Sequence, residues 1–356
     1  MDKHLLADAK DVVTELGPLN QRFSGKTILL TGAAGFLGSH FIHYFLLLND
    51  SGALAKPCRV VAWDNFIRGI PPWLAPLQGR KDLVCETRDI VQKHPIEGVD
   101  FIIHAASIAS PMFYRKYPIE TMDANVIGLR HLLDAVVAKP VESFLFFSTS
   151  EIYGDPDPAN IPTKETYRGF VSCTGPRSCY DESKRYGETL CVNFALAYKV
   201  PVKIVRPFNN YGPGLKISDR RVLPDFYRDV LADRNIVLLS DGRATRTFCY
   251  IADAIAGYLR VLLCEHNGEP FNIGSEAPEI SMRELAELVV KTSGKPLKVE
   301  YQKSEDPKYL TDNPQRRCPS LEKSARMLGY RTRISMQEGL ERTYRYYLDN
   351  PSAEDK

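Results

Sequence analysis

The stretch Lys26-Thr-Ile-Leu-Leu-Thr-Gly-Ala-Ala-Gly-Phe-Leu-Gly38 says most about the fold of this chain. A short apolar run leads directly into a loop with glycines at 32, 35 and 38, and the apolar residues Phe41–Leu48 follow. Such an order is typical of a buried strand, a tight loop and a buried helix. Glycines let the backbone approach a pyrophosphate, and the helix N-terminus favours its negative charge. We therefore expect a dinucleotide contact at this loop, made by Gly32, Gly35, Phe36, Leu37 and Gly38.

The same alternation continues to about residue 206. Further strand-like apolar runs occur at Arg59–Trp63, Phe101–His104, Phe144–Phe147 and Val202–Val205. Helical patterns separate most of them, for instance at Ile119–Ala138 and Ser178–Tyr198. Short buried strands that alternate with helices predict an α/β fold with a Rossmann-type, doubly wound parallel sheet.

Composition narrows the class of protein. The chain has 356 residues, 44% hydrophobic and 25% charged, with a net charge of +2, so a general nucleic-acid binder is not expected. Its eight cysteines show no Cys-x-x-Cys spacing, which predicts reduced thiols in a cytoplasmic protein and no metal site. The first ten residues do not resemble a signal peptide, and Phe41–Leu48 is too short to span a bilayer, so no membrane contact is expected.

The end of the second predicted strand, Val61-Ala-Trp-Asp-Asn65, indicates which dinucleotide is bound. A carboxylate at that place suits the hydroxyls of an adenosine ribose and would repel a 2′-phosphate. Asp64 therefore favours NAD over NADP. The nearby positive charge of Arg68 weakens this preference a little. The alternative is that Asp64 only caps a turn. The full set of expected cofactor contacts adds Asn65, Asp89, Ile90, Ala105, Ala106, Tyr180 and Lys184.

The predicted domains follow from these patterns. Residues 26–206 are expected to form the NAD-binding Rossmann domain. Beyond Arg206, proline, glycine and basic residues become frequent, and we expect 207–350 to be mainly a smaller α/β substrate lobe with segments that return to the first domain. Apolar residues between Leu5 and Leu16 recur at helical spacing, so residues 1–25 are expected to form a helical arm; a mobile tail is the alternative.

Polar residues follow the strand predicted at Phe144–Phe147, in the order Ser148-Thr-Ser-Glu151. Ligands of an open parallel sheet bind at the carboxyl ends of its strands, so Thr149, Ser150 and Glu151 should face the cofactor crevice. Thr149 can bond a sugar oxygen, and Glu151 could move a proton. The alternative is that one of them only caps a turn.

Tyr180 and Lys184 lie four residues apart, on one face of a predicted helix. A cation one turn away should favour the phenolate of Tyr180 and lower its pKa. Such a tyrosine can take a proton from a sugar hydroxyl while a hydride leaves the same carbon. The alternative is an exposed helix face with an ordinary i,i+4 contact.

Together these motifs resemble the extended short-chain dehydrogenase/reductases that act on nucleotide sugars, over about residues 26–350. The Ser150–Glu151 pair is similar to the pattern of the UDP-glucuronate decarboxylases, or UDP-xylose synthases; related 4,6-dehydratases typically carry Asp-Glu there, and 4-epimerases carry small neutral residues. The most specific matches are Ser148–Asp155, Gly175–Arg185, His104–Pro111, Arg206–Pro213 and Asp312–Arg317.

The resemblance implies an enzyme with a redox-neutral cycle, in which UDP-glucuronate becomes UDP-xylose. Tyr180 would accept the proton of the C4 hydroxyl while NAD⁺ takes the C4 hydride, with Thr149 engaging the same hydroxyl. The 4-ketone makes the sugar carboxylate a β-keto acid, which loses CO2 readily, and hydride return regenerates NAD⁺. The substrate contacts implied by the family are Ser107, Tyr114, Asn209, Arg221, Arg246 and Arg317.

Other features of the resemblance concern assembly and substrate choice. The helices at Ile119–Ala138 and Ser178–Tyr198 match those that pair in family dimers, so we expect a homodimer. The decarboxylases usually have lysines where this chain has Glu120 and Asp123, and acids there would repel an anionic sugar. A nucleotide-sugar 4-epimerase or 4,6-dehydratase with the same chemistry is therefore the alternative function. A non-catalytic nucleotide sensor is disfavoured because Thr149, Tyr180 and Lys184 are intact.

Overall fold

A computed structural model describes residues 1–304 and 311–351. Its strands are β1 (Thr27–Thr31), β2 (Arg59–Asp64), β3 (Leu83–Thr87), β4 (Phe101–His104), β5 (Ser143–Phe147), β6 (Val202–Pro207), β7 (Asn210–Tyr211), β8 (Ile236–Leu238), β9 (Thr245–Arg246), β10 (Cys249–Tyr250), β11 (Pro270–Ile273), β12 (Ile280–Ser281), β13 (Val299–Tyr301) and β14 (Arg316–Arg317). Its α-helices are α1 (Lys3–Leu16), α2 (Phe36–Asp50), α3 (Pro111–Lys116), α4 (Pro118–Asp123), α5 (Leu129–Ala138), α6 (Ser178–Tyr198), α7 (Val222–Leu231), α8 (Ile251–Leu262), α9 (Met282–Ser293), α10 (Glu322–Leu328) and α11 (Met336–Asp349).

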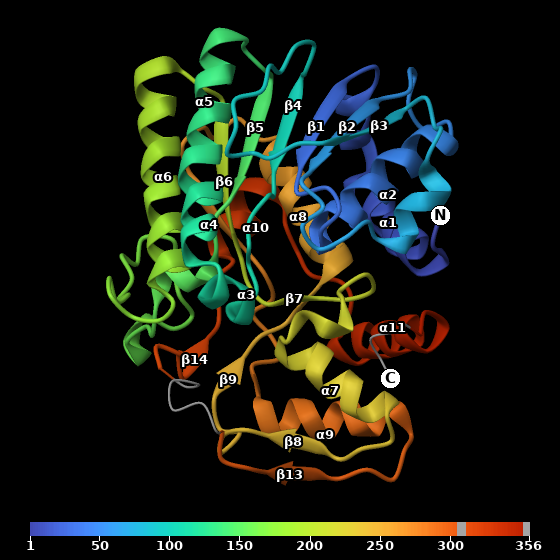
Figure 1. The fold of residues 1–356 in the computed structure, drawn as a ribbon, viewed down its shortest axis with the longest axis vertical. Coiled ribbons are helices and arrows are strands. Elements are labelled where there is room, and N and C mark those ends of the chain that lie inside the picture. Colours follow the sequence, from blue (N-terminus) through green and yellow to red (C-terminus); the bar gives the residue numbers. More distant parts are fainter. Residues whose placement is uncertain (305–310, 352–356) are drawn as a thin grey trace.

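A seven-stranded parallel sheet organises the upper lobe in Figure 1, and its order is β11-β6-β5-β4-β1-β2-β3. From β1 the chain winds outward through β2 and β3, then returns to β4 and winds the other way. The order therefore reverses between β1 and β4, and at such a point the loops beyond the strand ends leave a crevice for a ligand. The predicted Rossmann-type, doubly wound α/β fold is confirmed.

Both faces of this sheet are covered by helices. Successive strand residues point to opposite faces, and β1 shows the division clearly. Leu29 belongs to the apolar cluster that contains residues of α5 and α6, whereas Ile28 and Leu30 belong to the cluster that contains residues of α2 and α8. Burial on both faces explains why these strands are apolar throughout rather than alternating.

Two strands of the sheet were not predicted from the sequence. Both lie at its edges, β3 at one end and β11 at the other. β3 is only half buried, with a polar threonine and glutamate, so it lacks the apolar run of a central strand. β11 comes from the C-terminal part of the chain and pairs with β6 over Pro270–Ile273, which is a segment that returns to the sheet.

The helix predicted at Ile119–Ala138 is interrupted. A π-helical turn, η3 (Ala124–Gly128), separates α4 from α5. Such turns are frequent at functional sites, and the buried Asn125 of this turn donates a hydrogen bond to the Ser183 hydroxyl at 2.9 Å. The turn therefore ties the α4–α5 segment to α6, which carries Tyr180 and Lys184.

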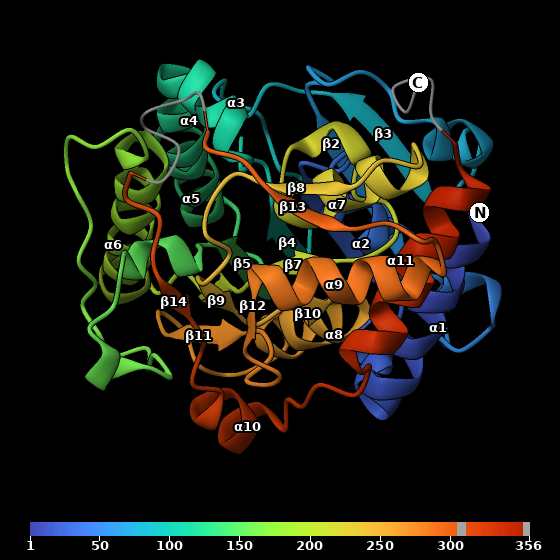
Figure 2. The same ribbon diagram turned by 90° about the horizontal axis from the view of Figure 1, so that it is seen from below.

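The lower lobe contains α7, α9 and the parallel pair β8–β13 (Figures 1 and 2). Helix α1 packs on α2 and α8 of the same chain, and its buried residues Leu5, Ala9, Val12 and Leu16 form the apolar face. Within the described residues, no helix combines the length and the apolar character that a membrane span requires.

Candidate active site

One cavity of about 2400 Å³ opens between the two lobes. It lies beyond the carboxyl ends of β1, β4 and β5, where the strand order reverses. All the residues predicted to bind cofactor or substrate, or to act in catalysis, line this cavity. The structure therefore brings together side chains that lie up to 285 positions apart, from Gly32 to Arg317, although lining a cavity does not by itself assign a role.

The glycine loop is built as a cradle for a phosphate group. Gly32 has a φ of +72°, and a Cβ there would lie 2.7 Å from the backbone nitrogen of Ala106. At Gly38 a Cβ would lie 2.5 Å from the carbonyl oxygens of Gly32 and Ala33. The N-terminus of α2 has no side-chain cap at Gly35, so its backbone amides remain available to an anion. These features fit a dinucleotide pyrophosphate.

Asp64 lies at the end of β2, beside this loop. Its carboxylate accepts hydrogen bonds from the amides of Ala34, at 2.9 Å, and Phe66, at 2.8 Å. Each carboxylate oxygen can accept another bond, so Asp64 can also receive ribose hydroxyls. The side-chain oxygens of Asp89 and Asn65 accept similar hydrogen bonds within turns, from the amides of Val91 and Ile67 respectively. The capping role considered for Asp64 is thus present, and it is compatible with cofactor binding.

We predict that the protein binds NAD in preference to NADP, and that Asp64→Ala weakens NAD binding. The variant loses a charge-assisted hydrogen bond worth roughly 1.5–3 kcal/mol. Asp64→Asn is the matched control, because it keeps an acceptor for the Ala34 amide but removes the charge that repels a 2′-phosphate. Asp64→Asn should therefore lower the ratio of the affinity for NAD to the affinity for NADP. Titration of each variant with NADH and NADPH measures both effects, and equal or tighter NADP binding by the parent would contradict the prediction.

Tyr180 lines the cavity and is 6% exposed. Its ring stacks on the ring of Tyr114 at a centroid distance of 5.0 Å and an angle of 8°. A hydrogen bond joins its side chain to that of Thr149, whose hydroxyl also accepts one from the Glu151 amide at 3.2 Å. Thr149 and Tyr180 therefore present neighbouring hydroxyl groups to one point of the cavity.

The pKa predicted for Tyr180 is wrong for this structure. Burial raises the pKa of Tyr180 to about 12, and the hydrogen bond from Thr149 only partly offsets it. The Lys184 ammonium lies 5.9 Å from the centroid of the Tyr180 ring and donates to the Phe147 carbonyl at 2.7 Å. Burial also lowers the pKa of Lys184 to about 7. Desolvation is the largest cause of both pKa shifts, and spacing along a helix cannot reveal it.

Glu151 lies in a cluster of arginines at the same end of the cavity. Its carboxylate pairs with the guanidinium of Arg317 through both oxygens and also with Arg177. Burial alone would raise the pKa of Glu151, but Arg177 and Arg317 hold it at about 2. Glu151 is therefore ionised at neutral pH, and it is an acceptor and a positioning group rather than a proton donor.

Arg246 adds further positive charge to this cluster. It donates to the backbone oxygens of Thr245, Pro314 and Gln315 and to the side chain of Asn313. Burial and the neighbouring Arg317 lower the pKa of Arg246 to about 9. The cluster thus contains Arg177, Arg246 and Arg317 against the carboxylate of Glu151 and that of Asp181, which lies 3.7 Å from Arg177. Because burial raises the pKa of Asp181 to about 7, the cluster keeps a surplus of positive charge, which favours an anion.

The remaining predicted substrate residues are held by neighbouring elements. Ser107 donates to the Asn125 side chain at 2.8 Å, which links it to the π-helical turn. Asn209 donates to the Thr247 carbonyl at 2.8 Å. Arg221, at the start of α7, pairs with Asp219. Glu120 and Asp123 of α4 also line the cavity. Across the described ranges, no His, Cys, Asp and Glu side chains cluster in a way that could hold a metal ion.

Sequence reasoning missed Arg177 and Asp219. Arg177 stands three residues before Tyr180, inside the Gly175–Arg185 stretch that carries the family resemblance, so its charge next to the Tyr180 motif is a signal present in the sequence. Asp219 is 2% exposed and carries two arginine contacts, but its own sequence neighbourhood, Ser218-Asp-Arg-Arg221, looks like an exposed charged turn. Only the fold shows that Asp219 is buried within this turn.

Comparison with known proteins agrees with the fold and the cavity. Residues 28–274 match the model of the NAD dependent epimerase/dehydratase family. The chain is 36% identical to UDP-glucuronic acid decarboxylase 6 of Arabidopsis thaliana over 338 residues, which cover 93% of each protein. It is 35% identical to UDP-glucuronic acid decarboxylase 2 of the same plant over 324 residues, 91% of this chain and 68% of that protein.

Among solved structures, the UDP-glucuronic acid 4-epimerase of Bacillus cereus, in complex with UDP-glucuronic acid and NAD, superposes with a TM-score of 0.76. The two chains are 26% identical, and the alignment covers 91% of this chain and 99% of the epimerase. The glycine cradle, the strand order and the matched family model agree, and they confirm NAD as the predicted cofactor. This chain belongs to the NAD dependent epimerase/dehydratase family.

Proposed function

We propose that this protein is an NAD-dependent nucleotide-sugar lyase that decarboxylates a UDP-hexuronic acid, converting UDP-glucuronate to UDP-xylose. The observation that carries the proposal is the arginine cluster beside Tyr180. Arg177, Arg246 and Arg317 surround one ionised carboxylate, Glu151, in a buried part of the cavity. A uronate brings a negative charge that the surplus positive charge would stabilise, and arginine forks match a carboxylate well. The relatives named as UDP-glucuronic acid decarboxylases support the same choice.

The proposed mechanism starts at C4 of the sugar. Thr149 would bond the C4 hydroxyl and Tyr180 would accept its proton. NAD⁺, when bound, supplies the acceptor for the C4 hydride, returns that hydride at the end of the cycle, and brings the positive charge that can lower the pKa of a buried phenol. Lys184, held by the Phe147 carbonyl, would orient this end of the site.

Loss of CO2 follows from the ketone at C4, which makes the sugar carboxylate a β-keto acid. Arg317 and Arg177 would hold that carboxylate, with Glu151 fixing both guanidinium groups. The carbanion left at C5 would take a proton from solvent water. Tyr180 would then return its own proton to the C4 oxygen as the hydride returns to C4. Arg221 would contact the diphosphate of the substrate, and Asn209 and Tyr114 would contact the sugar. Ser107 and Ser150 would contribute hydroxyl groups nearby.

A second candidate function is favoured by the acidic residues of α4. Glu120 and Asp123 line the cavity and would repel a uronate that bound beside them. A nucleotide-sugar 4-epimerase or 4,6-dehydratase would use the same Tyr180 chemistry on a neutral sugar. It would then return the hydride to the other face of C4 or eliminate water.

The two functions are separated by product mass. The purified protein should be incubated with UDP-, dTDP-, GDP- and CDP-linked sugars, and the products read by mass spectrometry. A decarboxylase lowers the mass of UDP-glucuronate by that of one CO2. An epimerase leaves the mass unchanged but alters the sugar released by hydrolysis, and a dehydratase removes the mass of one water from a neutral sugar. Release of no CO2 from any uronic-acid nucleotide would overturn the decarboxylase proposal.

The proposal includes a homodimer formed by α5 and α6. These helices lie side by side at one edge of the upper lobe in both views (Figures 1 and 2), and Val137, Tyr186, Leu196 and Tyr198 on them are 41–67% exposed. The same faces of two copies could pair about a two-fold axis. We also propose that residues 26–206 form the NAD-binding domain, that 207–350 form mainly the substrate lobe, and that the protein is cytoplasmic, in keeping with eight free cysteines.

We predict that Leu196→Glu converts the dimer to a monomer, because it places a charge among the exposed apolar residues of α6 that we assign to the interface. Light scattering after size exclusion measures the mass of the particle. Leu348→Glu is the matched control, since Leu348 is 51% exposed on α11, outside the proposed interface, and it should leave the dimer intact. A parent protein that runs as a monomer at micromolar concentration would contradict the proposal.

A further inference from the structure

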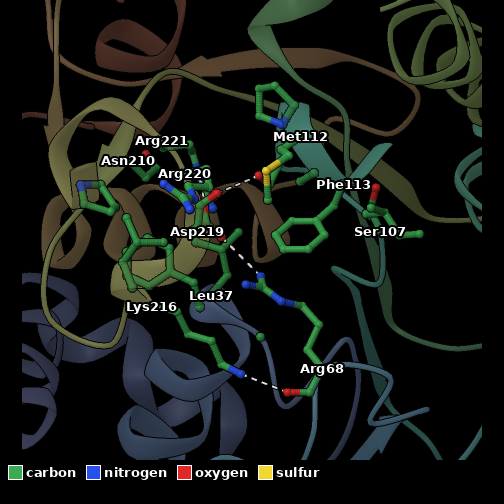
Figure 3. A pocket seen from close by; sticks show the side chains of 18 of the residues that line it. Leu37, Arg68, Ser107, Met112, Phe113, Asn210, Lys216, Asp219, Arg220 and Arg221 are labelled. Atoms are coloured by element: carbon green, nitrogen blue, oxygen red, sulfur yellow. Dashed lines mark hydrogen bonds and ion pairs between the residues drawn. The ribbon is translucent and has the colours of Figure 1, made fainter. Parts of the chain in front are cut away.

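The loop that follows β2 reaches across the mouth of the cavity to the lower lobe. It begins at Asn65, where the cofactor ribose is expected, and its Arg68 meets the turn η6 (Ile217–Asp219) and the segment beyond it. Figure 3 shows the contact: the Arg68 guanidinium donates to Asp219 at 3.1 Å, and the Arg68 carbonyl accepts from the Lys216 ammonium at 2.9 Å. The loop is thus joined to the lower lobe through both its side chain and its backbone.

Asp219 is the centre of this contact. It is 2% exposed, and its two carboxylate oxygens receive different arginines: one accepts from Arg68 and the other from Nε of Arg221. Its backbone carbonyl accepts a hydrogen bond from the Ser110 hydroxyl at 2.7 Å, in the loop that also holds Ser107. Burial would raise the pKa of Asp219, but Arg221 and Arg68 hold it below its ordinary value. The carboxylate therefore stays ionised at neutral pH.

The contact leaves Arg68 well oriented although it is partly exposed. Its guanidinium lies 4.7 Å from the centroid of the Phe113 ring, on α3 at the sugar end of the cavity. The Arg68 guanidinium therefore has two contacts, the face of the Phe113 ring and the carboxylate of Asp219. Together they define one position for this long side chain. Arg68 thus pairs with Asp219, whereas the carboxylate of Asp64 accepts from the amides of Ala34 and Phe66.

We propose that Asp219 is a positioning residue with two roles. Through Arg68 it holds the Asn65–Gly69 loop over the bound NAD, and it aligns Arg221 for the diphosphate of the nucleotide sugar. Because of this arrangement, which we call the latch, each ligand slows the loss of the other. The single carboxylate of Asp219 accepts from two guanidinium groups, those of Arg68 and Arg221. The remaining positive charge favours a diphosphate at Arg221. A diphosphate bound at Arg221 holds the η6 segment in place, and with it the Asn65–Gly69 loop over the cofactor. The inference uses the nucleotide placement of the proposed function but not the decarboxylation.

The test measures cofactor retention rather than turnover. The full-length protein is loaded with NADH, and its fluorescence decay is followed after a chase with excess NAD⁺, with and without UDP. UDP should slow NADH dissociation from the parent about fivefold or more, the lower range of coupling between two binding sites. By linkage, the factor by which UDP tightens the equilibrium binding of NADH must equal the factor by which NADH tightens that of UDP. Calorimetry in both orders of addition measures this coupling factor.

Arg68→Met and Asp219→Asn should each reduce this coupling factor to near one. The double variant should be no worse than Asp219→Asn alone, because Asp219→Asn already disrupts the contact with Arg68 as well as the one with Arg221. Matched controls are Arg80→Met and Asp82→Asn, which break an ion pair of 2.8 Å in the same lobe that does not line the cavity, and these should keep the parental coupling.

Either of two results would overturn the latch: a parental coupling factor in Arg68→Met, or effects of the two single variants that add in the double variant. Arg68 is partly exposed, so its variant should fold even if Asp219→Asn does not. A protein that shows the coupling but releases no CO2 from uronic-acid nucleotides would overturn the proposed function alone.

Discussion

Replacing Tyr180 with phenylalanine should abolish turnover while leaving the fold and nucleotide binding intact. The substitution keeps the ring that stacks on Tyr114 and removes only the hydroxyl that bonds Thr149. Loss of a general base typically lowers a rate by about 10²–10⁴-fold. Production of UDP-xylose from UDP-glucuronate, read by mass, measures the loss, and titration with UDP and NADH checks that the ligands still bind.

Tyr153→Phe is the matched control for this variant. Tyr153 is 2% exposed, lies outside the cavity lining, and donates a buried hydrogen bond to Asn272 at 2.7 Å. Both variants therefore lose one buried tyrosine hydroxyl, but only Tyr180→Phe loses it in the cavity. Near-parental activity of Tyr180→Phe would transfer the role of base to another group; equal losses in both variants would show that the effect is structural.

The Glu151→Gln variant should separate oxidation at C4 from loss of CO2. Glutamine keeps the shape of the side chain but removes the charge that orients Arg177 and Arg317. Tyr180 and Thr149 remain, so the variant should still bind UDP-glucuronate and form bound NADH, seen by its absorbance. Release of CO2 should fall by more than ~10²-fold, within the range for a lost catalytic or charge-stabilising group.

Glu188→Gln provides the control for the loss of a buried ion pair. Glu188 pairs with Arg206 at 2.6 Å, and neither residue lines the cavity. Glu151→Gln and Glu188→Gln should both lower the free energy of unfolding, because each removes a carboxylate that pairs with a buried arginine. Only Glu151→Gln should change the ratio of CO2 released to NADH formed. Release of CO2 from Glu151→Gln at the parental rate would leave Glu151 without a role in the chemistry.

The ion pairs of Glu151 depend on pH through the pKa of its carboxyl group. The carboxyl has a pKa of about 2 in the folded protein, below its ordinary value, because Arg177 and Arg317 favour the ionised form. Its pairing is therefore fully present above the pKa of the unfolded chain and is lost as the pH falls toward 2. Across the neutral range Glu151 does not titrate, so a pH–rate profile between 6 and 9 should report other groups.

Much of this protein could be predicted from the sequence, because the relevant physics is local. The glycine loop has no room for a Cβ at Gly32 and Gly38, and the strand and helix periods show which faces are buried. The helix at Ser178–Tyr198 was predicted at the bounds that the structure gives α6, so Tyr180 and Lys184 lie one turn apart as expected. The edge strands β3 and β11 were missed because half-buried edges lack an apolar run.

Only the tertiary structure decided which charges meet and what burial does to them. Arg317 reaches Glu151 across 166 residues, and Arg68 reaches Asp219 across 151, through contacts that no local pattern encodes. The pKa of Tyr180 moved opposite to the prediction, because helical spacing reveals the distance to Lys184 but not the loss of water around both groups. Backbone geometry is set by neighbouring residues, whereas desolvation and long-range ion pairs depend on everything that the fold brings near.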